Sequence, residues 1–287
     1  MAARIREAEG IKYEQGYQEG YKKGMYTGGD GVVDQLMPPG VILPEITLHQ
    51  IVAAGIEQMR SHLHPVMGTE EVVSRVLDAL DHGEPLAVIR LGDGELLAMA
   101  QETLMSAEQV REEGPFLEYA GVHVPDLGVR DQLVQALSGN SIVGIPLLRL
   151  PNFQPLAFAV FRAYGIDYRS LKLTHSTINY AIYLEHCLSR IVTGRRLLLV
   201  GNKSVELAEI FRANGIHVAG AIAPVNGAGD IPRVMGEIAA YDFDLALISA
   251  GIPAVILSHR VATEFGKVAI DFGHLADSML KGEAPYA

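Results

Sequence analysis

Beyond residue 85 the chain alternates between short apolar runs and amphipathic segments. The apolar runs, each with the length and composition of a buried strand, cover residues 86–91, 141–146, 195–201, 217–223, 243–251 and 267–273. The intervening segments repeat apolar residues at the spacing of helices and include 125–139, 177–194, 204–215 and 253–266. Near-continuous apolar strands separated by helices are typical of a parallel sheet covered on both faces. The pattern therefore predicts an α/β, Rossmann-like fold.

Two helices are predicted ahead of the first strand. Thr47 is followed three residues later by Gln50, which is the spacing of a capping box, and apolar residues recur behind it. A second helix is expected to begin at a cap on Thr69 and to run to about Asp81, with its valines turned inward.

The first 45 residues differ from the rest. Two sets of residues repeat every four positions: the tyrosines 13, 17 and 21 and the glycines 16, 20, 24 and 28. On a helix each set forms one stripe, but an interior glycine costs roughly 1 kcal/mol relative to alanine. Such a helix is expected to pair with a second copy, giving a homo-oligomer, or to fold onto the body. The alternative is a flexible polar leader. Prolines 38, 39 and 44 predict an extended linker, so we divide the chain into 1–45 and 46–287.

Charge and cysteine content narrow the class of protein. The net charge of −11 argues against a nucleic-acid groove and against binding to an anionic membrane. Cys187 is the single cysteine, so no intrachain disulfide can form and a reducing compartment is expected. We find neither a signal-peptide pattern nor an apolar run long enough to span a bilayer. A cytoplasmic protein is therefore expected.

The first strand ends in an acidic turn, Gly92-Asp93-Gly94-Glu95. In parallel sheets, ligands bind at the carboxyl ends of strands. Asp93 and Glu95 would repel a phosphate directly, but carboxylates two residues apart in a glycine-rich loop can bind Mg²⁺ or Mn²⁺, and the cation can hold a diphosphate. The alternative is structural, because Asp-Gly is a common turn and a glutamate in the first helical turn favours the macrodipole.

Two stretches resemble one known family. "VIRLGDGELL" resembles the R-x-G-D-G-E segment of the bacterial GT-D-fold glycosyltransferases, and "DLALISAGIPAVILSHRVATEFGKVAIDFGHLAD" resembles the end of the same family. The resemblance covers roughly residues 70 to 280, and it implies a GT-D-type sheet preceded here by an N-terminal helical extension. It further implies transfer of a sugar from a nucleotide donor, typically UDP-linked, to a glycan or glycoprotein acceptor. The family's metal-binding D-x-E pair corresponds to Asp93 and Glu95.

Other polar residues at strand ends suit the same chemistry. A departing diphosphate needs positive groups nearby, which Arg90 and Lys203 can supply. Gly92 allows close approach of the backbone, Asn202 begins the loop that contains Lys203, and Asn226 is placed to contact the base or ribose. The structural alternatives are a salt bridge for Arg90 and ordinary turns for the other loops, with Ser204 as a helix cap.

A hydroxyl acceptor benefits from a general base, for which His274 is the best-placed candidate. Asp271 and Asp277 lie three residues to either side, and an Asp-His pair can orient an imidazole and tune its pKa. The alternative is a structural cluster at a helix start.

Two other functions remain open at this point. A different Rossmann-type nucleotide-binding enzyme is disfavoured because Leu97 stands where the dinucleotide fingerprint has its third glycine. A non-catalytic module recruited to an assembly through the glycine-tyrosine segment is the other possibility. The sugar and the stereochemistry of transfer do not follow from residue spacing.

Overall fold

The computed structural model describes residues 2–149 and 153–286, with side chains from residue 13 onward. The chain folds into two compact units, Met1–His64 and Pro65–Ala287. The predicted division lay at residue 45, so the helix that begins at Leu48 belongs to the first of these units. The position of the domain boundary stays a prediction.

The first unit is helical, as predicted. It contains α1 (Ala2–Gly28), α2 (Asp30–Leu36), α3 (Leu48–Gln58) and the short 3₁₀ helix η1 (Arg60–His62). Residues 37–47 form no helix or strand, in agreement with the predicted linker. The capping box that opens α3 is present, because Thr47 Oγ1 accepts a hydrogen bond from the Gln50 backbone N–H and the Gln50 side chain accepts one from the Thr47 N–H.

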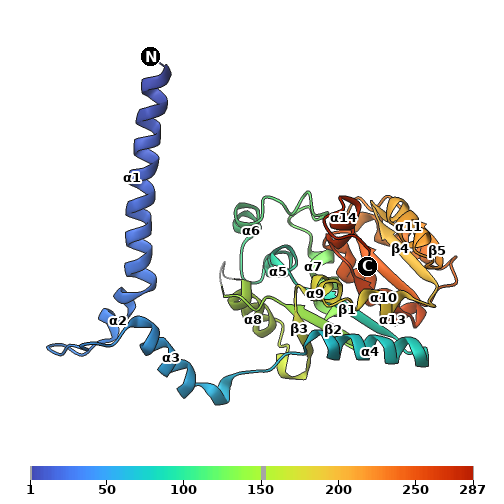
Figure 1. The fold of residues 1–287 in the computed structure, drawn as a ribbon, viewed down its shortest axis with the longest axis horizontal. Coiled ribbons are helices and arrows are strands. Elements are labelled where there is room, and N and C mark those ends of the chain that lie inside the picture. Colours follow the sequence, from blue (N-terminus) through green and yellow to red (C-terminus); the bar gives the residue numbers. More distant parts are fainter. Residues whose placement is uncertain (1, 150–152, 287) are drawn as a thin grey trace. The chain divides into compact units, whose positions relative to one another are not determined.

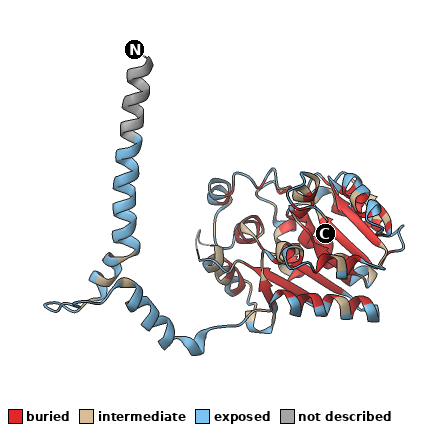
Figure 2. Cartoon of the chain, in the orientation of Figure 1, coloured by how far each residue is buried: buried red, intermediate tan, exposed pale blue. Residues whose placement is uncertain are grey.

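Most described residues of the first unit are exposed (Figure 2). Tyr13, Tyr17 and Tyr21 on α1 are each more than half exposed. A Cβ atom added at the glycines at 16, 20, 24 and 28 would meet nothing within 4 Å. The two stripes on α1 are therefore open surface within this unit.

The second unit, drawn from teal to red in Figure 1, is built on a sheet. This sheet has seven strands in the order β3-β2-β1-β7-β6-β4-β5. Every strand pair is parallel. The strands are β1 (Leu86–Arg90), β2 (Ser141–Ile145), β3 (Lys172–His175), β4 (Leu197–Gly201), β5 (Val218–Ile222), β6 (Leu245–Ser249) and β7 (Val268–Asp271). Six of them are the predicted strands. β3 was missed because this four-residue edge strand buries only Leu173 and Thr174.

The helices of this unit alternate with the strands. They are α4 (Thr69–His82), α5 (Asp93–Ala100), α6 (Ala107–Glu113), α7 (Leu127–Ala136), α8 (Phe153–Ala163), α9 (Ile178–Leu184), α10 (Leu188–Val192), α11 (Ser204–Ala213), α12 (Ile231–Ile238), α13 (Pro253–Phe265) and α14 (Leu275–Leu280), with 3₁₀ turns η2 (Tyr168–Ser170) and η3 (Ala228–Asp230). Among the described helices, none combines the length and the apolar character needed to cross a bilayer.

Three local predictions need correction. Segment 177–194 is two helices rather than one, because His186 adopts a positive φ of 57° between α9 and α10. Thr69 is the first residue of α4 rather than its cap, and its hydroxyl donates to Glu185 Oε1 at 2.6 Å. Ser204 likewise opens α11, and its hydroxyl donates to the Ile222 carbonyl oxygen at 2.9 Å instead of capping the helix.

The sheet buries both faces, as its apolar strands predicted. Successive residues of a strand point to opposite faces, so Ile89 packs in one core cluster while Val88 packs in the other. The first cluster includes residues of α5, α7, α8, α12 and α13, and the second includes residues of α4, α9, α10, α11 and α14. Figure 2 shows the buried strands between the two helical layers.

Two neighbouring strands at the centre of the sheet lead into opposite layers. β1 continues into α5, which packs in the first cluster, whereas the adjacent β7 continues into α14, which packs in the second. Where the chain leaves neighbouring strands toward opposite faces, a crevice opens at their carboxyl ends, and ligands bind there in open α/β sheets.

Candidate active site

A cleft of about 720 Å³ lies at this edge of the sheet. The nine residues singled out from the sequence all line it: Arg90, Gly92, Asp93, Glu95, Asn202, Lys203, Asn226, Asp271 and His274. They come from the ends of β1, β4, β5 and β7. The fold thus brings together residues that lie up to 184 positions apart, between Arg90 and His274.

The acidic turn is the N-terminus of α5. Gly92 is the cap, and its N–H donates to Glu95 Oε2 at 2.7 Å, while the Gly94 N–H donates to Asp93 Oδ1 at 2.9 Å. A Cβ atom on Gly94 would lie 3.2 Å from Ile252 Cδ1, which favours glycine there. Each of these hydrogen bonds uses one carboxylate oxygen, so the capping geometry is compatible with a ligand at the other.

Burial changes the proton affinity of two acids in the cleft. Burial, and then the nearby charge of Asp271, raise the pKa of Glu95 from 4.5 to about 7, although the hydrogen bond from Gly92 acts in the opposite direction. Burial also raises the pKa of Asp271, against the lowering effect of the Arg90 guanidinium. Burial thus makes the ionised form of each of these two acids costly in the crevice.

Arg90 joins the two central strands. Its Nη2 lies 3.0 Å from Asp271 Oδ1, its Nε donates to the Asp271 carbonyl oxygen, and its Nη1 donates to the Ser176 carbonyl oxygen and to Asn179 Oδ1. The Asn179 amide in turn donates to the Phe272 carbonyl oxygen at 2.8 Å. Arg90 is thus held in the salt bridge that was the structural alternative for this residue.

His274 is the cap residue of α14 and is exposed in the cleft, with Asp277 also in the lining. The anticipated Asp-His pair takes a different form, since Asp271 bonds to Arg90 and no hydrogen bond joins it to His274 in the described part of the chain. The role of each residue in catalysis stays a prediction.

The far end of the cleft is built by the loops after β4 and β5. Asn202 Oδ1 accepts a hydrogen bond from the Val225 N–H at 2.7 Å, which ties the two loops together. Asn226 donates to Asp230 Oδ2 through both its backbone N–H and its Nδ2. Lys203 lies 3.4 Å from Glu206, but both side chains are half exposed, so this ion pair is weak.

The cleft also contains residues that the sequence did not indicate. Phe116 and Tyr119 line it from the irregular segment between α6 and α7. This segment follows a helix rather than a strand, so it lies outside the strand ends at which ligand-binding residues are expected. The sequence clue to this segment was a pair of aromatic residues in a stretch whose apolar residues do not repeat at the spacing of a helix.

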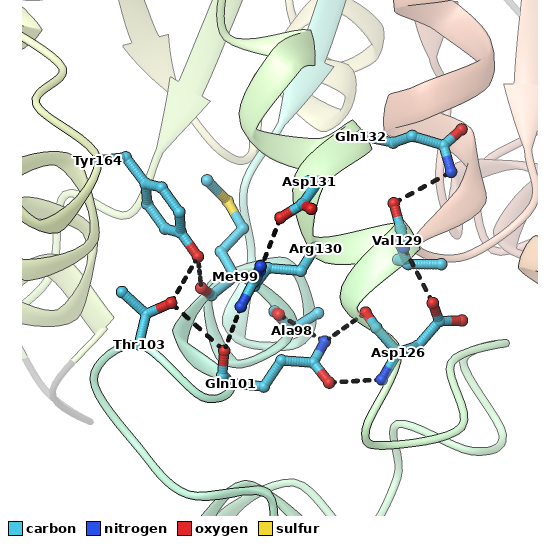
Figure 3. Close-up of polar contacts among 11 residues, drawn as sticks. Ala98, Met99, Gln101, Thr103, Asp126, Val129, Arg130, Asp131, Gln132 and Tyr164 are labelled. Atoms are coloured by element: carbon cyan, nitrogen blue, oxygen red, sulfur yellow. Dashed lines mark hydrogen bonds and ion pairs between the residues drawn. The ribbon is translucent and has the colours of Figure 1, made fainter.

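The far end of α5 is anchored by a polar network (Figure 3). The buried side chain of Gln101 donates to the Ala98 and Asp126 carbonyl oxygens and accepts from the Asp126 N–H at 2.7 Å. The Tyr164 hydroxyl donates to the Met99 carbonyl oxygen at 2.8 Å. These bonds fix the helix whose other end carries Asp93 and Glu95.

The side chains of the cleft can hold a divalent cation only if a bound substrate supplies further oxygen ligands. Within residues 2–149 and 153–286, no group of three His, Cys, Asp or Glu side chains is arranged to hold a metal. Asp93 and Glu95 offer hard oxygen donors of the kind that Mg²⁺ and Mn²⁺ prefer, and Mg²⁺ is commonly bound by one or two carboxylates plus substrate phosphates. The donor set therefore fits a cation that is shared with a phosphate-bearing substrate.

The fold agrees with a family profile and with a solved structure that has a TM-score above 0.5. The family profile described as a GT-D fold-like domain matches residues 67–279. A solved structure described as a new glycosyltransferase (DUF1792) from Streptococcus sanguinis is 16% identical, with 77% of this chain and 86% of that chain covered and a TM-score of 0.53. Another, described as the domain of unknown function 1792 with a distinct glycosyltransferase fold, is 18% identical over 75% of this chain and 82% of that chain, with a TM-score of 0.46. No curated protein matches. The chain belongs to the GT-D-like family.

Proposed function

We propose that this protein is a metal-dependent glycosyltransferase that moves a sugar from a nucleotide donor, UDP-linked, to a hydroxyl of a glycan or glycoprotein. Asp93 and Glu95 bind Mn²⁺ or Mg²⁺, which holds the donor diphosphate. The observation that supports this best is the pair of carboxylates at the start of α5, inside the cleft between β1 and β7.

The electrostatics of the cleft support a cation at the acidic turn. The pKa of Glu95 is about 7 because its carboxylate is buried near Asp271. A buried ionised acid is costly unless it is paired or bound to a metal. A divalent cation would displace the proton from Glu95, and it would supply the charge that stabilises a departing diphosphate.

The remaining residues have distinct roles in this proposal. Arg90 fixes Asp271 and the end of β7, and thereby the start of the loop that carries His274. His274, exposed in the cleft, accepts the proton of the attacking hydroxyl. Lys203 and the amides of Asn202 and Asn226 contact the nucleotide at the other end.

The proposal is tested by thermal shift with UDP-sugars and other nucleotide-sugars, each with and without Mn²⁺. We expect stabilisation that needs both components, because a ligand that binds only the folded state raises the melting temperature. Asp93→Ala and Glu95→Ala should lose this stabilisation and the hydrolysis of the donor while remaining folded. Full activity in both variants, or stabilisation by a nicotinamide cofactor alone, would contradict the proposal.

A further inference from the structure

The segment between α6 and α7 is attached to two loops of the cleft through its backbone. The Ala228 N–H donates to the Gly121 carbonyl oxygen at 2.9 Å, and the Ile252 N–H donates to the Ala120 carbonyl oxygen at 3.3 Å. A Cβ atom on Gly121 would lie only 2.7 Å from Gly227 Cα, so the two backbones meet there. The segment is therefore fixed to the loops that follow β5 and β6.

Two aromatic side chains stand just before this attachment, and we call Phe116 and Tyr119 the aromatic wall. Both line the cleft. Tyr119 is 94% exposed and Phe116 is 38% exposed. A ring this exposed is accessible to a ligand, and because its backbone is fixed, only the side chain has to be ordered on binding.

The backbone contacts connect the wall to more than one part of the cleft lining. Phe116 reaches the acidic turn, where its Cε2 is 3.5 Å from the position of a Cβ on Gly94. Tyr119 adjoins Ala120 and Gly121, which contact the loops after β6 and β5. In the sheet order, β1 and β4 are three strand spacings apart, roughly 14 Å. A nucleotide whose diphosphate lies at Asp93 would thus extend its base toward Tyr119.

Polar groups suited to the edge of a base lie at the same end. The hydrogen bonds that hold the two amides use Oδ1 of Asn202 and Nδ2 of Asn226, so Asn202 keeps its donor and Asn226 keeps its acceptor. Bases are commonly recognised by stacking on an aromatic ring together with hydrogen bonds to their edges. An aromatic ring and two amides in the lining of one cleft match that chemistry.

We propose that Tyr119, supported by Phe116, stacks on the nucleobase of the donor and thereby contributes to the choice of nucleotide. This inference rests on the proposed function, because it assigns the base to the end of the cleft opposite the diphosphate. It makes Tyr119 a specificity residue that acts through binding and takes no part in the transfer of the sugar.

The test is calorimetry on the full chain in Mn²⁺ with UDP, CDP, ADP and GDP, and with inorganic pyrophosphate as the probe that lacks a base. Tyr119→Ala should weaken binding of the preferred nucleotide about 5- to 100-fold and leave pyrophosphate unchanged. Tyr119→Phe should bind like wild type, because the ring is kept. Tyr13→Ala, an exposed tyrosine of the first unit, is the matched control and should change neither affinity.

Two outcomes separate this inference from the proposed function. If wild type binds a nucleotide and Tyr119→Ala binds it equally well, the stacking role is wrong, and a raised KM for the acceptor in that variant would show that the ring faces the acceptor instead. If wild type binds neither nucleotides nor pyrophosphate in Mn²⁺, the proposed function itself fails. Unchanged far-UV circular dichroism in the variants verifies that they are folded.

Discussion

Arg90 at the end of β1 and Asp271 at the end of β7 form an ion pair across the crevice, with 3.0 Å between Nη2 and Oδ1. Their side chains are only 19% and 4% exposed. Because β1 and β7 lead into opposite helical layers, this pair fixes the two loops that carry the acidic turn and His274. We therefore expect the pair to hold the shape of the site.

Removing one partner of this pair should destabilise the fold. Arg90→Met leaves Asp271 buried without its cation and is expected to lower the free energy of unfolding by about 3 kcal/mol in urea denaturation. The control is Arg60→Met, since Arg60 and Glu57 form a pair that is 75% and 67% exposed and should contribute well under 1 kcal/mol. Equal effects of the two substitutions would contradict the structural role of Arg90.

Substitution of Gly273 should lower the melting temperature, because a side chain there would collide with Arg90 of the same ion pair. Its φ is +56°, and a Cβ atom there would collide with the Arg90 guanidinium. Gly266→Ala is a matched control, because that glycine has a φ of +67° but its Cβ would meet nothing within 4 Å.

Both substitutions place alanine in left-handed backbone, which costs roughly 1–2 kcal/mol. Only Gly273→Ala also displaces Arg90, so its melting temperature should fall further than that of Gly266→Ala. Equal melting temperatures would show that Arg90 moves aside without cost, and would weaken the case that the guanidinium is held in place.

The pKa of Glu95 predicts how stability depends on pH. The unfolded chain releases this proton near pH 4.5, whereas the native protein keeps it up to about pH 7. The native state then binds more protons than the unfolded state between these values, so this group makes the free energy of unfolding fall as pH rises through that window. Without metal, Glu95→Gln should therefore be more stable than wild type at pH 8, by about 1–3 kcal/mol, and similar at pH 4.

Metal binding should show the opposite dependence on pH. Since a cation must displace the proton from Glu95, stabilisation by Mn²⁺ should increase from pH 6 to pH 8 in wild type and be lost in Glu95→Gln. Thermal shift in the presence of a nucleoside diphosphate measures both effects. The exposed Glu112→Gln serves as the control and should follow wild type at every pH. A Mn²⁺ response independent of pH would contradict coordination by Glu95.

The residues themselves show why some features followed from the sequence and others did not. Runs such as 197–201 are apolar at every position because both faces are buried, and this marks the strands and their ends. Asp93 and His274 could therefore be assigned to one edge without knowledge of the strand order. The short edge strand β3 has too few buried positions to produce such a signal.

Pairings between distant residues were beyond the sequence pattern. Arg90 and Asp271 are 181 positions apart, so only the folded structure shows that Asp271 accepts its side-chain hydrogen bond from an arginine. The aromatic wall was missed for a related reason. Tyr119 reaches the cleft through backbone hydrogen bonds at Ala120 and Gly121, which no side-chain periodicity encodes.

Self-association through α1 is the last prediction. The helix has four glycines in one stripe with open space above them and tyrosines that are more than half exposed, which is an arrangement that isolated helices do not sustain well in water. We propose that two copies pair through this stripe. Gly20→Leu combined with Gly24→Leu should shift the protein toward monomer in light scattering, because the leucines block close approach of the two backbones even though they favour the helix itself.

The control places the same two side chains on the other side of α1. Gln18 and Lys22 also lie four residues apart, and each precedes a substituted glycine by two positions, so leucines there add equal apolar area about 200° around the helix. This variant should keep the wild-type mass, whereas the glycine-stripe variant should not. Identical masses for all three proteins would mean that the stripe joins no second copy, and donor hydrolysis should be unaffected in each of them, because none of the substituted residues lines the cleft.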